Sequence, residues 1–159
     1  MATPDIGTPA PDFTLPGTSP DGPRDYTLSA ERGHPVVIVF YPGDDTPVCT
    51  AQLCSYQADL ATFADLDATL WGISLQGVAS HEKFAAKRGL TFPLLSDVDK
   101  TVHREYGVLL PIIGTKRSAF VVDAEGIVRW RHVSTIGLTY QGVQDLAAAV
   151  RELSTSPTT

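Results

Sequence analysis

Both cysteines of the chain lie five positions apart, in the segment PGDDTPVCTAQLC at residues 42–54. Cysteine reacts as its thiolate, since the neutral thiol is nearly inert as a nucleophile. Two thiols this close together are typical of redox chemistry or of metal binding in a reducing compartment. A free cysteine can also serve as a small buried apolar residue. The residues around the two cysteines indicate which of these interpretations applies.

The residues before Cys49 predict that it lies in the first turn of a helix. Thr46 is a favoured N-cap residue, and Pro47 is favoured at N1, where its missing N–H costs nothing. Cys49 then occupies N3, close to unpaired backbone N–H groups and to the positive end of the helix dipole. Both features stabilise a thiolate, so we expect Cys49 to be a reactive thiol.

The second cysteine, Cys54, cannot reach the first while that helix is intact. Five residues of helix separate two Cα atoms by about 8.6 Å, beyond the limit of about 7 Å for a disulfide. A disulfide between Cys49 and Cys54 therefore requires the first turns of the helix to unwind.

These cysteines need an element that positions them, and the sequence predicts a strand directly before them. Residues 36–41 (VVIVFY) form a β-branched and aromatic run that is typical of a strand buried on both faces. A stripe spaced by four and three residues then predicts a helix from residue 46 to about residue 65; its members are Cys49, Leu53, Tyr56, Leu60 and Phe63. Catalytic residues of α/β sheets gather at such strand ends.

The rest of the 159-residue chain predicts a single α/β domain over residues 1–153, with a disordered tail over residues 154–159. Further strands are expected at residues 68–74 and in a hairpin over residues 117–133, and further helices at residues 79–89, 98–107 and 139–153. This order predicts a central mixed sheet with helices on both faces, preceded by an N-terminal β extension.

Composition excludes several classes of function. The formal net charge is −6 and no run of Lys and Arg occurs, so we expect neither nucleic-acid binding nor membrane-surface binding. No export signal is visible, and we expect a cytoplasmic protein. No zinc spacing or nucleotide-binding motif is present, so we expect no metal or cofactor. The histidines at 34, 81, 103 and 132 are expected at the surface or at strand ends, and both tryptophans in the core or the sheet.

The segment around Cys49 resembles the peroxiredoxins, whose active-site pattern is Pro-x-x-x-Thr-x-x-Cys. Pro42, Thr46 and Cys49 match its fixed positions. The stretch FYPGDDTPVCTAQLC most resembles the Q-type, or bacterioferritin-comigratory-type, subfamily, in which a second cysteine often follows five residues later. APDFTL, GIS, FPLLSD and RSAFVVDAEGIVR extend the likeness along nearly the whole chain.

The resemblance implies a thioredoxin-like fold and a thiol peroxidase acting on hydrogen peroxide and organic hydroperoxides. By this analogy Cys49 is the peroxidatic cysteine, Cys54 the resolving cysteine and Arg117 the active-site arginine. Thr46 would donate a hydrogen bond to peroxide, and Pro42 would act as a rigid lid that keeps water from the thiolate. A thioredoxin-like protein thiol would reduce the resulting disulfide.

The sequence departs from the subfamily at two places: Gln52 stands where Glu is common, and Leu75-Gln76 where an Asp is usual. We expect neither to touch the reacting atoms. Three alternatives remain open: a one-cysteine peroxidase resolved by an external thiol, a non-enzymatic redox sensor using the same switch, and a general thiol-disulfide oxidoreductase. The spacing argues against the last, which would use Cys-x-x-Cys. We expect a monomer, with a homodimer as the alternative.

Overall fold

A seven-stranded mixed sheet forms the centre of the computed structural model, which describes residues 3–44, 46–110, 114–134 and 141–155. The strand order is β2-β1-β5-β4-β3-β8-β9. The strands are β1 (Thr14–Ser19), β2 (Gly22–Thr27), β3 (Val36–Phe40), β4 (Thr69–Ser74), β5 (Leu94–Ser96), β8 (Ser118–Val122) and β9 (Val128–Val133). A separate pair, β6 (Leu109–Leu110) and β7 (Gly114–Thr115), lies beside the sheet.

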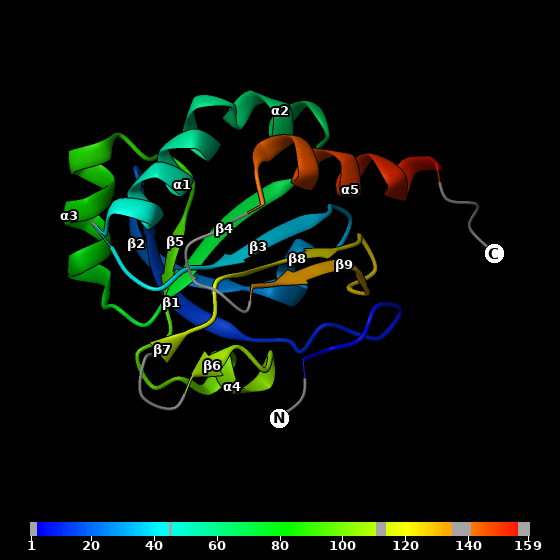
Figure 1. The fold of residues 1–159 in the computed structure, drawn as a ribbon, viewed down its shortest axis with the longest axis horizontal. Helices are drawn as coiled ribbons and strands as arrows, with labels where there is room; N and C mark the ends of the chain where they lie inside the picture. The colour runs from blue at the N-terminus through cyan, green and yellow to red at the C-terminus, as the bar shows by residue number, and fades with distance from the viewer. Residues whose placement is uncertain (1–2, 45, 111–113, 135–140, 156–159) are drawn as a thin grey trace.

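The helices cover both faces of this sheet (Figure 1). They are η1 (Leu28–Glu31), α1 (Pro47–Ala58), α2 (Leu60–Asp65), α3 (Val78–Arg88), α4 (Thr101–Glu105) and α5 (Val143–Thr155). Helices α1, α2 and α5 lie above the sheet in the view of Figure 1, and α4 lies below it with β6 and β7. The expected mixed sheet with helices on both faces is confirmed.

Strand β3 divides the core into two because its side chains alternate between the faces. Val37 and Val39 pack with α1, α2, α3 and α5. Val36, Ile38 and Phe40 pack with α4 and the N-terminal segment. All five residues are buried, as the apolar run predicts.

The sheet has parallel and antiparallel parts, and their arrangement places the end of β3 near the start of β8. Strands β3, β4 and β5 are parallel, whereas β8 runs antiparallel to β3 with Phe40 opposite Ser118. Residues that follow β3 and residues that precede β8 therefore meet at the same edge. The N-terminal extension is the β1–β2 hairpin, joined to the sheet through β5.

Several element boundaries differ from the expected ones. The helix expected over residues 46–65 is two helices, because the backbone leaves helical geometry at Asp59 (φ −113°, ψ 26°). Helix α5 continues to Thr155, so residues 154–155 of the expected disordered tail are helical. Residues 139–140 of the expected last helix and residues 156–159 of the tail lie outside the described residues.

The junction between the hairpin and the sheet leaves no room at Gly17. A Cβ atom there would lie 2.8 Å from the Leu94 carbonyl oxygen, whereas at Gly77 it would have no neighbour within 4 Å. We expect Gly17→Ala to lower the free energy of unfolding by about 1–3 kcal/mol, as overpacking does, and Gly77→Ala by about 0.5 kcal/mol. Urea unfolding of both variants checks this. Equal midpoints for the two would contradict it.

Candidate active site

The first turn of α1 has the geometry that the sequence predicts. Thr46 is the N-cap with extended backbone (φ −84°, ψ 150°), and Pro47 begins the helix, which places Cys49 at N3. The Thr46 side chain does not cap the helix; its hydroxyl donates to the Gly43 carbonyl at 3.0 Å. Thr46 therefore stabilises the turn before the helix, and its hydroxyl oxygen keeps its acceptor capacity.

Arg117 contacts the sulfur of Cys49 directly. Its Nη2 atom donates to Cys49 Sγ at 3.2 Å, and both residues are buried, with exposed fractions of 4% and 0%. They meet because Arg117 immediately precedes β8, whose first residue lies opposite the last residue of β3. A guanidinium is permanently charged, so the sulfur lies beside a fixed positive charge in an apolar setting.

Gln52 is a component of the same network, although its contacts are with Arg117 and Tyr56 and not with the sulfur, as expected. Its Oε1 accepts a hydrogen bond from Arg117 Nη1, so Gln52 is one residue removed from the sulfur. Its Nε2 donates to the Tyr56 hydroxyl at 3.0 Å, and that hydroxyl donates to the Gln141 carbonyl at 2.6 Å. The sequence carries a signal for this role, because Gln52 is three residues after Cys49 on the same helix face.

Cys54 lies in the same intact helix as Cys49, with its side chain half-buried at the edge of the core. Both thiols are free. Pro42 is half-buried directly after Tyr41, and its expected role as a lid stays a prediction.

The expectation that every histidine lies at the surface or at a strand end is wrong for two of them. His81 and His103 are fully buried, and each pairs with an aspartate. His81 Nδ1 lies 2.7 Å from Asp44 Oδ2, and His103 Nδ1 lies 2.6 Å from Asp97 Oδ2. A lone histidine carries no local pattern that reports burial, so the sequence alone does not reveal these pairs.

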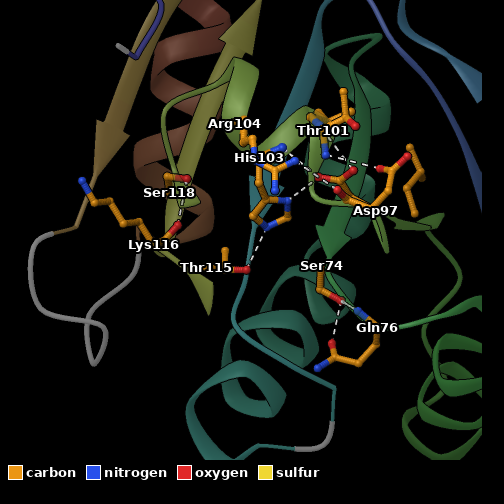
Figure 2. A network of polar contacts seen from close by, with 12 residues as sticks. Ser74, Gln76, Asp97, Thr101, His103, Arg104, Thr115, Lys116 and Ser118 are labelled. Carbon is orange, nitrogen blue, oxygen red and sulfur yellow. Dashed lines mark hydrogen bonds and ion pairs between the residues drawn. The ribbon is translucent and has the colours of Figure 1, made fainter. Parts of the chain in front are cut away.

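The Asp97–His103 pair connects β5, α4 and β7 (Figure 2). Asp97 also accepts the backbone N–H groups of Val102 and His103, at 3.3 and 2.7 Å. On its other side, the His103 ring is 2.8 Å from Thr115 Oγ1. Burial raises the pKa of Asp97, but the hydrogen bonds and the charge of His103 outweigh it and hold that pKa below its ordinary value.

The Asp44–His81 pair lies on the face of the sheet that carries Cys49. Burial raises the pKa of Asp44, but the hydrogen bond and charge of His81, with hydrogen bonds from Ser80 and Tyr41, bring it below the ordinary value. Burial also raises the pKa of Tyr41 well above its ordinary value, and the charge of Asp44 adds to this effect. Tyr41 therefore stays protonated and donates to Asp44 at 2.7 Å.

The part of the chain that the structure describes contains no group of three or more His, Cys, Asp or Glu side chains arranged to hold a metal ion. In the same residues, no helix is both long and apolar enough to cross a membrane.

Solved structures share the fold of this chain. The chain superposes on Mycobacterium bovis AhpC with a TM-score of 0.88 at 22% identity, covering 100% of this chain and 97% of that one. It superposes on the peroxidoxin BcpB of Mycobacterium tuberculosis with a TM-score of 0.83 at 30% identity, covering 94% and 98%. Fold and site define a thioredoxin-like protein built around one buried, arginine-paired cysteine.

A model of the AhpC/TSA family matches residues 6–131. Peroxiredoxin Bcp of Xanthomonas campestris is 39% identical over 138 residues, which cover 81% of this chain and 86% of that protein. The chloroplastic peroxiredoxin Q of Oryza sativa subsp. japonica is 41% identical over 126 residues, which are 78% of this chain but only 57% of the rice protein. The chain therefore belongs to the AhpC/TSA family of peroxiredoxins.

The lowered pKa of Asp97 predicts a loss of stability in acid. A carboxyl whose folded-state pKa lies below its ordinary 3.8 contributes stability above that value, and the contribution is lost as pH falls through the folded-state pKa. We expect the free energy of unfolding to decline less steeply in Asp97→Asn than in the parent between about pH 4 and pH 2. Denaturant unfolding against pH measures this, with the exposed Asp65→Asn as control. Parallel profiles for Asp97→Asn and the parent would refute it.

The Gln52 network predicts an effect on the reactivity of Cys49. Gln52→Ala removes an acceptor from Arg117 and a donor from Tyr56, so the guanidinium is less firmly directed at the sulfur. We expect the second-order rate of Cys49 oxidation by hydrogen peroxide to fall about tenfold, and Gln52→Glu, which keeps an acceptor, to lose less. Stopped-flow kinetics give both rates. Equal rates for Gln52→Ala and the parent would show that Gln52 has no such role.

Proposed function

We propose that this protein is a thiol-dependent peroxidase of the Q and Bcp type, reducing hydrogen peroxide and organic hydroperoxides through Cys49. The observation that carries the proposal is the 3.2 Å contact between Arg117 Nη2 and the buried Cys49 sulfur at helix N3. A cation and a helix N-terminus on one sulfur favour the thiolate, which is the nucleophile that a peroxide requires.

In the first step the Cys49 thiolate attacks one peroxide oxygen. An S–O bond forms as the O–O bond breaks, the sulfur is oxidised by two electrons to a sulfenic acid, and the leaving oxygen takes a proton as water or an alcohol. Negative charge develops on the oxygens, and Arg117 and the first-turn backbone N–H groups are donors placed near the sulfur. Thr46 must rotate its hydroxyl away from Gly43 to donate.

In the second step the Cys54 thiol attacks the sulfenic sulfur, which forms the Cys49–Cys54 disulfide and releases water. The two residues lie in one intact helix, so α1 must unwind at its N-terminal end for this step. A thioredoxin-like protein thiol then reduces the disulfide by exchange, which supplies two electrons and restores both thiols. We further propose that the protein acts as a monomer in the cytoplasm.

Two alternatives use the same Cys49 chemistry. An external thiol in place of Cys54 would make this a one-cysteine peroxidase, and a slow reaction coupled to partner binding would make it a redox sensor. The half-buried position of Cys54 in α1, with the core side of the helix held by Leu53 and Tyr56, favours the intramolecular route. Only the N-terminal end of the helix has to open.

Two single substitutions test the nucleophile and the resolving thiol separately. Cys49→Ser lacks the nucleophile, so we expect its oxidation rate to fall by at least about 1,000-fold. Cys54→Ser keeps the first oxidation but stops at the sulfenic acid and is recycled more slowly by thioredoxin. Stopped-flow oxidation followed by intact mass and thiol counting distinguishes one added oxygen from the loss of two hydrogens.

The parent is the matched control for both variants. Peroxide consumption by Cys49→Ser at the parent rate would overturn the proposal. Recycling of Cys54→Ser at the parent rate would show that an external thiol, and not Cys54, resolves the sulfenic acid, while Cys49 would remain the peroxidatic cysteine.

A further inference from the structure

The loop that joins β3 to α1 carries Pro42 and Thr46, and the side chain of Asp44 connects it to other elements. Asp44 Oδ1 accepts the Tyr41 hydroxyl at 2.7 Å. Asp44 Oδ2 accepts the Ser80 hydroxyl and faces His81 Nδ1, each at 2.7 Å. One carboxylate thus connects the loop to the end of β3 and to α3.

His81 extends this connection into the sheet. Its Nε2 lies 2.9 Å from the Leu95 carbonyl oxygen, which only accepts, so Nε2 carries a hydrogen. Its Nδ1 faces the Asp44 carboxylate, so the two ring nitrogens connect the loop to the sheet. Solvent does not screen the pair, because the exposed fractions of the two side chains are 0% for His81 and 5% for Asp44.

A buried pair of this kind holds its two segments firmly, because separating it leaves a charge without a partner in an apolar setting. The backbone N–H of Asp44 adds a bond to the Gln76 side chain at 3.2 Å. At the other end of α1, Gln57 and Thr91 exchange hydrogen bonds of 2.7 and 2.9 Å. The helix is therefore tethered before its first turn and again in its last turn.

We propose that Asp44 and His81 are positioning residues that form a latch on the active-site loop. The latch holds the loop for attack of Cys49 on peroxide, and it opposes the unwinding of the first turn that disulfide formation requires. This inference rests on the proposed function. A closed latch accelerates the oxidation of Cys49 and slows the formation of the disulfide. The two steps of the cycle therefore depend on the same pair in opposite ways.

Rapid quenching of single turnovers tests the latch. Reduced protein is mixed with one equivalent of hydrogen peroxide, quenched with an alkylating reagent and weighed, which resolves thiol, sulfenic acid and disulfide. In Asp44→Asn and His81→Gln we expect Cys49 oxidation to slow about tenfold, since misplacement by about 1 Å can cost about 100-fold. We expect disulfide formation to become about fivefold faster, because the opening equilibrium shifts by the interaction lost.

Controls separate the latch from a general loss of stability. Asp97→Asn disrupts a buried pair of the same chemistry on the opposite face of the sheet, and we expect it to leave both rates unchanged. Ser80→Ala removes one donor from Asp44 without leaving a buried charge, so it can be tested even where the stronger variants fail to fold. We expect its oxidation to be slightly slower and its disulfide formation slightly faster than in the parent. In the double variant Asp44→Asn/His81→Gln, we expect effects no larger than in either single variant.

Each result of the quenching experiment either supports or overturns the latch. Opposite changes of the two rates in the latch variants, absent from Asp97→Asn, support the latch. Changes in the same direction, no change, or equal changes in Asp97→Asn overturn it. A parent protein that peroxide does not oxidise refutes the proposed function instead, so the two failures are distinguishable.

Discussion

The contact between the Arg117 guanidinium and the Cys49 sulfur is the interaction on which the site depends. Both groups are buried, and a cation removed from water is costly unless a charged or strongly polar partner compensates it. The sulfur and the side-chain Oε1 of Gln52 supply that compensation on one side of the guanidinium. The contact that makes burial of the arginine tolerable therefore also places a fixed positive charge beside the sulfur.

The sheet brings these residues together through register rather than through proximity in sequence. Cys49 and Arg117 are 68 positions apart, yet the antiparallel pairing of β3 with β8 places the end of one beside the start of the other. The alternation of β3 then determines which face receives them. Helix α1 packs on the face of Val37 and Val39, and Arg117 reaches the sulfur on that same face.

The sequence predicts local geometry well and contacts between distant segments poorly. The N-cap and N1 residues determine the position of Cys49 in its helix, and the apolar run determines that β3 is buried, because both effects act within a few residues. Only the family resemblance indicates that Arg117 belongs to the site, since no spacing relates it to Cys49. The pairs of His81 and His103 escaped prediction for the same reason. The division of the helix at Asp59 was missed because neither Pro nor Gly marks it.

In the proposed cycle, helix α1 must hold Cys49 in place for oxidation and must open for disulfide formation. Its contacts hold the C-terminal half and the first turn in different ways. Tyr56 is bonded to the Gln141 carbonyl and Gln57 to Thr91, so moving the C-terminal half would break contacts with two other segments. The first turn is held to the core through Cys49 and its bond to Arg117. In the proposed cycle, oxidation converts that sulfur from an anion into a neutral sulfenic acid, which attracts the guanidinium less. The chemistry itself thus weakens the contact that holds the first turn, and the helix becomes easier to open at the moment when Cys54 must approach.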